Sequence, residues 1–145
     1  MSNTQSVRVG LGVIIENENG HILIGKRTGS HAPYYSIPGG LLDIGESFVA
    51  GAIREVQEET DLTISNPEVI TITNNLKTYQ QEGKHHISII LWSNSFSGEL
   101  IIKEPTKCES WLWANPQDLP RPHFEASEAG VACWLQNTVT PNQQS

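Results

Sequence analysis

Residues 39–62 read GGLLDIGESFVAGAIREVQEETDL, the most informative stretch of the chain. It opens on two glycines, and Ser47 is a good N-cap for the helix that follows. Gly51 inside that helix costs roughly 1 kcal/mol relative to alanine, which suggests that something packs closely there. Apolar residues recur at helical spacing, at Val49, Ala52, Ile53 and Val56. The stretch therefore predicts a loop followed by an amphipathic helix with one buried stripe.

Acidic residues gather on another face of the same helix. Glu55, Glu58 and Glu59 lie within roughly 100° of one another, at about 100° per residue. Six of the sixteen acids of the chain lie between residues 43 and 61, where Arg54 alone opposes them. Hard divalent cations prefer carboxylate and carbonyl oxygens. The cluster therefore indicates either a Mg²⁺ or Mn²⁺ site beside the glycine pair or a solvated acidic face.

The rest of the chain reads as strands and loops with one further helix. Asn19-Gly20 is a strong hairpin signal, and a second helix is predicted over residues 124–137. Strands are predicted over residues 6–17, 21–27, 41–46, 68–75, 85–95 and 107–114. This order predicts a single α/β or α+β domain over residues 1–145 with a mixed sheet. Residues 1–6 and 139–145 are expected to be disordered.

The length and charge of the chain limit its function. A chain of 145 residues with net charge −7 suits one acidic domain with a real core. An acidic surface argues against binding a nucleic acid polymer. It does not exclude a small phosphorylated ligand, because a bound metal supplies positive charge locally. No apolar run approaches the roughly 20 residues of a membrane span, and no signal peptide pattern is present. We therefore expect a cytoplasmic protein with Cys108 and Cys133 as reduced packing residues.

The spacing within residues 40–62 resembles the Nudix box, Gly-x5-Glu-x7-Arg-Glu-U-x-Glu-Glu-x-Gly-U, in which U is a bulky aliphatic residue. The match begins at Gly40, and every fixed position agrees except that Asp61 stands where the family has glycine. That position ends the helix, and aspartate is one of the few other residues that enter the left-handed region with some ease. The stretches GLLDIGESF, VITITNN and KCESWLW are most similar to the MutT-like branch, which hydrolyses nucleoside triphosphates.

The resemblance implies a Nudix fold, an α/β/α sandwich around a mixed sheet in which the box forms loop, helix and loop. It also implies Mg²⁺-dependent (or Mn²⁺-dependent) cleavage of a diphosphate linkage. Arg54 would orient the glutamates, Glu46 would brace the loop at Gly39 and Gly40, and Glu55 would take a proton from water. The implied metal ligands are Gly40 through its carbonyl, Glu55, Glu58 and Glu59, with Glu104 or Glu109 as a candidate for one more.

Further residues are candidates for substrate binding, and each has an ordinary structural alternative. Arg27 could contact phosphate oxygens or simply end a strand, and Tyr35 could stack on a base or belong to the core. Asn75 could bond a base edge or cap a turn. Gly39 and Gly40 would approach the phosphates through their backbone.

The likeness to the MutT-like branch predicts a small-molecule substrate, a nucleoside or deoxynucleoside triphosphate cut to the monophosphate and pyrophosphate. Oxidised purines such as 8-oxo-dGTP and plain pyrimidine triphosphates are both open. The alternatives are another nucleoside-diphosphate-linked compound, a prenyl diphosphate, or a dinucleoside polyphosphate, for which Tyr79 lies in the expected region. ADP-ribose is less favoured because residues 75–81 lack a proline. A catalytically inactive nucleotide sensor is disfavoured because the box glutamates are kept. A homodimer is also expected from the branch.

Overall fold

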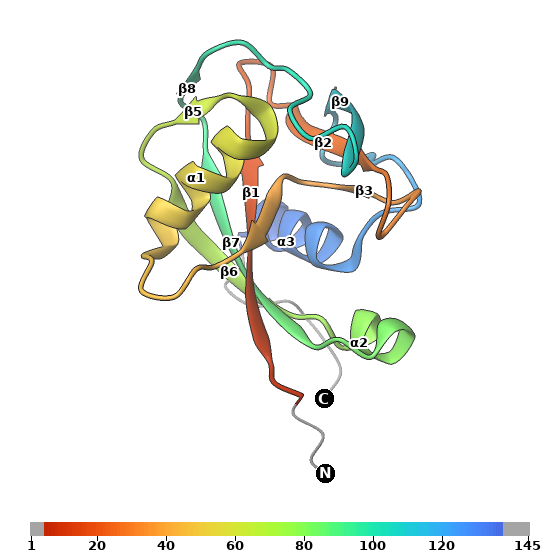
Figure 1. Cartoon of the computed structure of the whole chain (residues 1–145). Coiled ribbons are helices and arrows are strands. Elements are labelled where there is room, and N and C mark those ends of the chain that lie inside the picture. The colour runs from red at the N-terminus through yellow and green to blue at the C-terminus, as the bar shows by residue number, and fades with distance from the viewer. Residues whose placement is uncertain (1–4, 138–145) are drawn as a thin grey trace.

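The computed structural model describes residues 5–137, and Figure 1 shows the course of the chain. Of the two ends predicted to be disordered, Gln5 and Ser6 are exposed and belong to no helix or strand, and the other residues lie outside the described part. Nine strands and three helices follow one another in that part: β1 (Arg8–Ile15), β2 (Ile22–Arg27), β3 (Tyr35–Ser36), β4 (Gly39–Leu41), α1 (Phe48–Thr60), β5 (Thr63–Ile64), β6 (Glu68–Asn74), α2 (Leu76–Glu82), β7 (His86–Ser93), β8 (Phe96–Ser97), β9 (Cys108–Ala114) and α3 (Glu125–Gln136).

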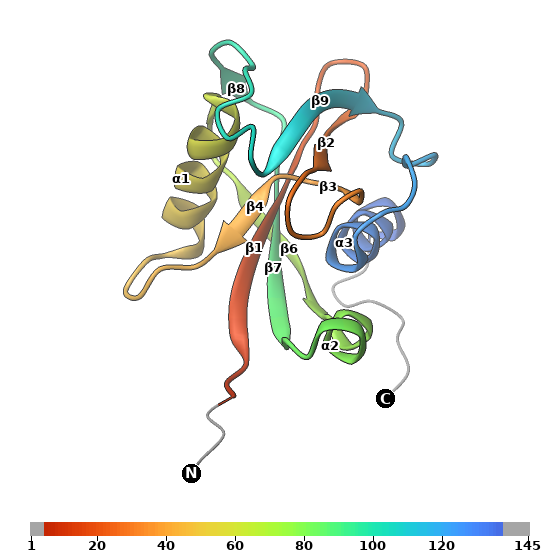
Figure 2. The same cartoon turned by 45° about the vertical axis from the view of Figure 1, so that its right-hand side comes forward.

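The central sheet has the strand order β4-β1-β7-β6. β1 and β7 are parallel, whereas β4 and β6 run antiparallel to their neighbours. A second sheet has the order β3-β2-β9, and β5 pairs with β8. Helices α1 and α3 lie on opposite sides of the central sheet (Figures 1 and 2). The predicted α/β/α sandwich with a mixed sheet is therefore confirmed.

Alternate residues of β1 supply both layers of the core. Val13 and Ile15 belong to a buried cluster that includes Val56 of α1. Ile14, between them, belongs to a second cluster that includes Val131 of α3. Successive side chains of a strand point to opposite faces, so a strand that is apolar at every position can be buried between two helices. This explains why the long apolar run at the start of the chain lies in the middle of the fold.

The hairpin predicted at Asn19-Gly20 forms only as a turn. The Asn17 side chain accepts the N–H groups of Asn19 and His21 at 2.9 and 3.0 Å, and Gly20 has φ +75°. A single bridge, Glu16 to Ile22, links the two strands. Beyond it β1 joins the central sheet and β2 the second one. The turn is a local property, but both strands are apolar on both faces and separate to bury them in different layers.

Helix α2 was not predicted from the sequence. Its first turn is held from outside, because the Glu125 carboxylate at the start of α3 accepts the N–H groups of Lys77 and Thr78 at 3.2 and 2.8 Å. It ends at Gly83, with φ +76°.

None of the helices in residues 5–137 is long and apolar enough to cross a membrane. Cys108 and Cys133 are both free and buried, as predicted.

Candidate active site

Helix α1 forms as the sequence predicts. The Ser47 hydroxyl accepts the N–H of Ala50 at 3.0 Å, and the helix ends at Asp61 in the left-handed conformation, with φ +69°. Gly51 packs closely, since a Cβ there would lie 2.6 Å from the Leu11 side chain. Val49 does not join the predicted stripe and is 42% exposed. The whole first turn, residues 48–50, is exposed, so burial begins only at the second turn.

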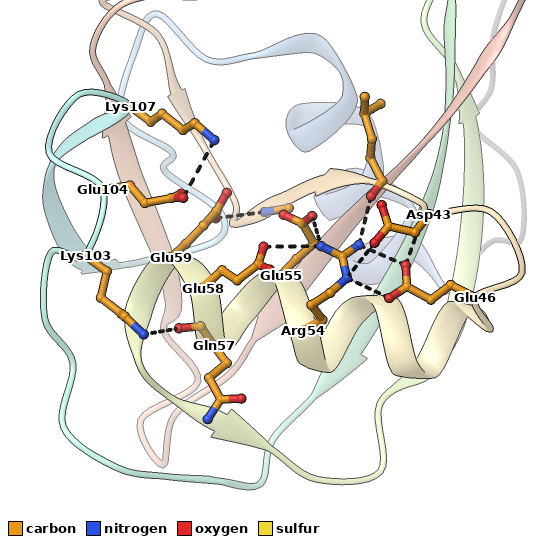
Figure 3. Close-up of polar contacts among 12 residues, drawn as sticks. Asp43, Glu46, Arg54, Glu55, Gln57, Glu58, Glu59, Lys103, Glu104 and Lys107 are labelled. Carbon is orange, nitrogen blue, oxygen red and sulfur yellow. Dashed lines mark hydrogen bonds and ion pairs between the residues drawn. The ribbon is translucent and has the colours of Figure 1, made fainter.

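Arg54 holds the acids of the box together, as the resemblance implied (Figure 3). Its Nε and Nη2 donate to the two oxygens of Glu46 at 2.6 and 2.8 Å. Its Nη1 donates to Glu55 at 2.7 Å and to Glu58 at 3.2 Å. Hydrogen bonds from Arg54 and from a backbone N–H lower the pKa of Glu46 to about 2. One guanidinium therefore fixes three carboxylates in place.

Glu46 braces a different part of the loop from the one expected. Its Oε1 accepts the N–H of Asp43 at 3.0 Å, because the turn at Gly45, with φ +80°, folds the chain back on itself. The N–H of Gly39 donates instead to Glu59 Oε1 at 3.1 Å. Glu46 thus supports the turn after β4, and Glu59 supports β4 itself.

Glu55 and Glu59 are the least solvated carboxylates of the helix. Glu55 is 8% exposed, and it packs so closely on Gly40 that a Cβ there would overlap its carboxylate. Burial raises the pKa of Glu55, and it raises the pKa of Glu59 to about 8 even though the Gly39 N–H stabilises the anion. The Glu58 side chain is 52% exposed. A cation would relieve this crowding of buried negative charge.

The backbone carbonyl that faces these carboxylates belongs to Gly39. Pro38 and Leu42 are hydrogen-bonded to β1 at 2.8 and 3.1 Å, and Gly40 is paired with β1 between them. Gly39 and Leu41 point the other way, since they contact Glu59 and Arg54 of α1. Gly39 and Leu41 stand in non-hydrogen-bonded pairs with β1, and a residue in such a pair turns both its N–H and its C=O away from the partner strand. The Gly40 carbonyl, predicted as a metal ligand, therefore points to β1, and the carbonyl turned toward the carboxylates of α1 is that of Gly39.

Glu104, and not Glu109, lies beside the buried carboxylates. After burial and the charge of Glu55, the charge of Glu104 also raises the pKa of Glu59. Both residues line the same small pocket, and Figure 3 shows the Glu104 side chain directed toward Glu59. Glu109 pairs instead with Lys26 at 3.6 Å. The sequence left these two acids undecided.

The oxygens in this region fit a hard divalent cation. They come from Gly39, Glu55, Glu58, Glu59 and Glu104, and carboxylate and carbonyl oxygens are what Mg²⁺ and Mn²⁺ bind. Among the described residues no three acidic, histidine or cysteine side chains already converge as a closed cage. The nearby guanidinium explains this, because Arg54 binds oxygens of Glu55 and Glu58.

A cleft of about 1060 Å³ opens on the other side of β4. Its floor is made by one face of β1 and β7, from residues at alternate positions: Arg8, Gly10, Gly12, His86, Ser88 and Ile90. The two glycines contribute no side chain to this floor. Gly39 and Gly40 also line this cleft. The edge strand β4 therefore separates the acidic helix from the cleft by one thickness of backbone.

Not all of the residues predicted to bind substrate lie in the cleft. Arg27 lines the cleft, and its Nε is buried with no hydrogen-bond partner among the described residues. Asn75 also lines it, but its amide donates to Ser88 and accepts from Thr73, at 2.9 and 2.8 Å. Tyr35 is not among the lining residues and packs against the second core cluster. The cleft also contains Arg8 and Lys84, which the sequence did not single out. Only the strand register brings them to this face.

Comparison with known proteins identifies the family of this chain. The model of the NUDIX domain matches residues 6–135. A MutT NUDIX hydrolase from Burkholderia pseudomallei has a similar solved structure, with a TM-score of 0.80 and 27% identity over 88% of this chain and 98% of that one. Among curated proteins, a putative 8-oxo-dGTP diphosphatase of Bacillus subtilis (strain 168) is 32% identical, over 74% of this chain and 66% of its own length.

An RNA pyrophosphohydrolase of Pelagibacter ubique (strain HTCC1062) is 29% identical, over 64% of this chain and 56% of its own length. The chain thus spans less than two thirds of the Pelagibacter protein, and the match to the Bacillus one is also partial. The family match extends over nearly all described residues and takes in both the acidic helix and the cleft. The chain therefore belongs to the NUDIX domain family.

Proposed function

We propose that the protein is a Mg²⁺-dependent hydrolase, also served by Mn²⁺, that cuts a nucleoside triphosphate to the monophosphate and pyrophosphate. One observation carries this proposal: a single edge strand, β4, separates the buried Glu55 and the half-buried Glu59 from a cleft of nucleotide size. A phosphate chain lying along Gly39 and Gly40 would meet the carboxylate cluster on one side, with its nucleoside in the cleft on the other.

Each residue of the site has its own proposed role. Glu55, Glu58, Glu59, Glu104 and the Gly39 carbonyl would hold the ion. When bound, that ion shields the phosphate oxygens and activates water. Arg54 keeps Glu55 and Glu58 oriented.

Water attacks phosphorus, the bond to the bridging oxygen of the leaving pyrophosphate breaks, and Glu55 accepts the proton released. Arg27 brings a buried, unpartnered Nε that a phosphate oxygen can satisfy. Its charge also reaches Glu59, whose pKa it lowers against the larger effect of burial. Arg27 therefore lies where the phosphate chain and the carboxylates would meet.

The names of the two curated relatives, an 8-oxo-dGTP diphosphatase and an RNA pyrophosphohydrolase, both fit cleavage of a phosphoanhydride on a nucleotide. We propose the free nucleoside triphosphate, with oxidised purines included, as the first substrate to test. The alternative of an inactive nucleotide sensor is disfavoured, because Arg54, Glu46, Glu55 and Glu58 form an intact hydrogen-bonded network.

The test is release of hydrolysis products with Mg²⁺, separated by chromatography, from nucleoside triphosphates, 8-oxo-dGTP, ADP-ribose, dinucleoside polyphosphates and prenyl diphosphates, compared by kcat/KM. The triphosphates should give the highest values. Glu58→Gln should abolish turnover and leave the fold intact, because Glu58 is exposed. No release from any compound, or full activity of Glu58→Gln, would refute the assignment.

A further inference from the structure

The positive charges of this acidic chain are unevenly neutralised. Five of its nine lysines and arginines form ion pairs with described acids, namely Lys26, Arg54, Lys103, Lys107 and Arg121. Within the described residues the other four, Arg8, Arg27, Lys77 and Lys84, form none. Three of these four line the cleft, and Lys77 does not.

Acids contribute little to the cleft. Of its described lining residues Glu82 alone is acidic, and its carboxylate is paired with His31 at 3.0 Å. Arg8, Arg27 and Lys84 therefore give the cleft a net positive charge, although the whole chain carries −7. A cleft of one sign concentrates ligands of the other sign. This local field is the opposite of what the overall charge predicts.

Two of the unpaired cations lie at the far end of the cleft from β4. Arg8 begins β1 and is paired in register with His86, which begins β7, and Lys84 lies two residues earlier. Both strands start beside α2 (Figure 2). β4 pairs with β1 over Gly10–Gly12, and Gly40 lies opposite Leu11, three residues beyond Arg8. At about 3.3 Å per residue, Arg8 therefore lies on the order of 10 Å along the floor from Gly40.

Small residues lie on the floor between Arg8 and Gly40. Gly10, which is paired with Leu41 of β4, has no side chain, and its neighbour on β7 is Ser88. Burial lowers the pKa of His86, and the charges of Arg8, His31 and Lys84 lower it further, whereas that of Glu82 opposes them. The charges of Arg8, from β1, and of Lys84, from the turn before β7, thus both reach the uncharged His86 ring. Arg8 and Lys84 are both exposed and free to reach a ligand.

We propose that Arg8, Lys84 and His86 form a second anion subsite, which binds a phosphate group on the 3′ side of the substrate's nucleoside. This inference rests on the proposed function, since it assumes that the reacting diphosphate lies at Gly39 and Gly40. The shared chemistry is a phosphate on O3′, which is present in a 3′-phosphorylated nucleotide and at the 5′ end of an oligonucleotide. In either case the cleft spans the nucleoside and holds a phosphate at each end.

Three substrates with the same base test this: a nucleoside 5′-triphosphate, the same compound with a 3′-phosphate, and a 5′-triphosphorylated dinucleotide. Either or both of the last two should show a kcat/KM higher by on the order of fivefold, through KM, as suits contacts with exposed cations. The advantage should shrink at higher salt, because the contacts are screened. A gain with one compound alone identifies whether the phosphate is a monoester or a diester.

Equal kcat/KM values for all three compounds would overturn the subsite and leave the proposed function standing. If none is hydrolysed, the proposed function fails, and the subsite is then tested separately by calorimetry. In that measurement a nucleoside 3′-phosphate should bind more tightly than the unphosphorylated nucleoside, and equal affinities would overturn the subsite.

Matched variants separate a subsite from a general charge effect. The double variant Arg8→Gln/Lys84→Gln should bring the ratio of kcat/KM values, with and without the 3′-phosphate, close to one. Lys77→Gln removes another cation that has no described ion pair, outside the cleft, and should keep the native ratio. All three residues are exposed, so folding should be unaffected. A native ratio in the double variant, or an equal loss in Lys77→Gln, would contradict the proposal.

Discussion

The N–H of Gly39 donates to the carboxylate of Glu59 at 3.1 Å, a bond that joins the edge strand of the sheet to the acidic helix. The Gly39 N–H points toward α1, while the polar backbone groups of its neighbour Gly40 point toward Leu11 of β1. The carboxylate cluster and the rim of the cleft are therefore parts of one hydrogen-bonded unit. A substitution on either side of β4 should therefore alter the geometry on the other side.

Gly40→Ala should damage both the site and the fold, because the added methyl would overlap the Glu55 carboxylate. We expect activity to fall at least about tenfold and the free energy of unfolding to fall by about 1–3 kcal/mol, the range for overpacking. Gly10→Ala is the control for stability, since its Cβ would meet Ser88 Oγ at 3.5 Å and the Gly40 carbonyl at 3.6 Å, ordinary contacts. Thermal unfolding of both variants checks this, and equal melting temperatures would contradict it.

Glu59→Gln should make the metal-free protein more stable at pH 7, by about 1 kcal/mol. The amide oxygen of glutamine can still accept the Gly39 N–H. A neutral side chain avoids the cost of burying a negative charge, which is the effect that raises the pKa of Glu59 to about 8. Millimolar Mg²⁺ should raise the melting temperature of the native protein, because a ligand that binds the folded state stabilises it. The variant should lose most of that rise. An equal Mg²⁺ shift in both proteins would remove Glu59 from the ion site.

Glu104→Gln and Glu109→Gln form a matched pair of substitutions from the same part of the chain. Glu104 lies beside Glu59, whereas Glu109 pairs with Lys26 at 3.6 Å. We expect Glu104→Gln to lower kcat about tenfold or more, within the range of a lost metal contact, and Glu109→Gln to stay within about twofold. Steady-state kinetics over a range of Mg²⁺ concentrations measures both. The reverse order of effects would assign the further ligand to Glu109.

His123 should make stability depend on pH below neutrality. The ring is buried, with Nδ1 donating to the Pro120 carbonyl at 2.9 Å and Nε2 accepting from the Ser127 hydroxyl at 2.7 Å. Burial lowers the pKa of His123 in the folded state, so the unfolded chain binds the proton more readily. Its contribution is therefore complete above the unfolded pKa of about 6.5 and is lost as pH falls through the folded pKa.

Burial also raises the pKa of Glu59 to about 8. Protonation of Glu59 therefore favours the folded state as the pH falls, which opposes the effect of His123 over the same pH range. The quantity to measure is thus the difference between the native protein and His123→Asn in urea unfolding at pH 7 and pH 5. The native protein should lose more stability on acidification than the variant does. Identical changes in both proteins would show that His123 does not titrate in this window.

Asp61→Gly should leave activity within a few fold and stability within about 1 kcal/mol. Glycine adopts the left-handed conformation, φ +69° here, without the roughly 1 kcal/mol that it costs other residues. The variant loses an exposed ion pair with Lys103 at 3.2 Å, worth about the same or less. Lys103→Gln removes the same ion pair, together with the hydrogen bond from Lys103 to the Gln57 carbonyl at 3.3 Å, and serves as the control. A large loss of activity confined to Asp61→Gly would mean that this carboxylate takes part in ion binding.

Features that depend on neighbouring residues could be predicted from the sequence alone. Ser47 caps a helix and Asp61 ends it because each depends on backbone dihedrals and hydrogen bonds a few residues away. The apolar periodicity gave most of the strands and the buried side of α1, and the box spacing gave the family. Arg54, Glu55 and Glu58 could be placed because they lie within about one turn of one another on the same helix, and the box spacing indicated Glu46.

Strand register and packing decided what the local pattern could not. Whether Gly39 or Gly40 turns its carbonyl to the helix depends on which of the two stands in a hydrogen-bonded pair with β1. Whether Glu104 or Glu109 nears Glu59, and whether Arg8 shares a cleft with Lys84, depend on strands paired over long stretches of chain. A shift of one residue reverses every facing side chain. Such choices depend on burying the whole core at once, so no short segment contains them.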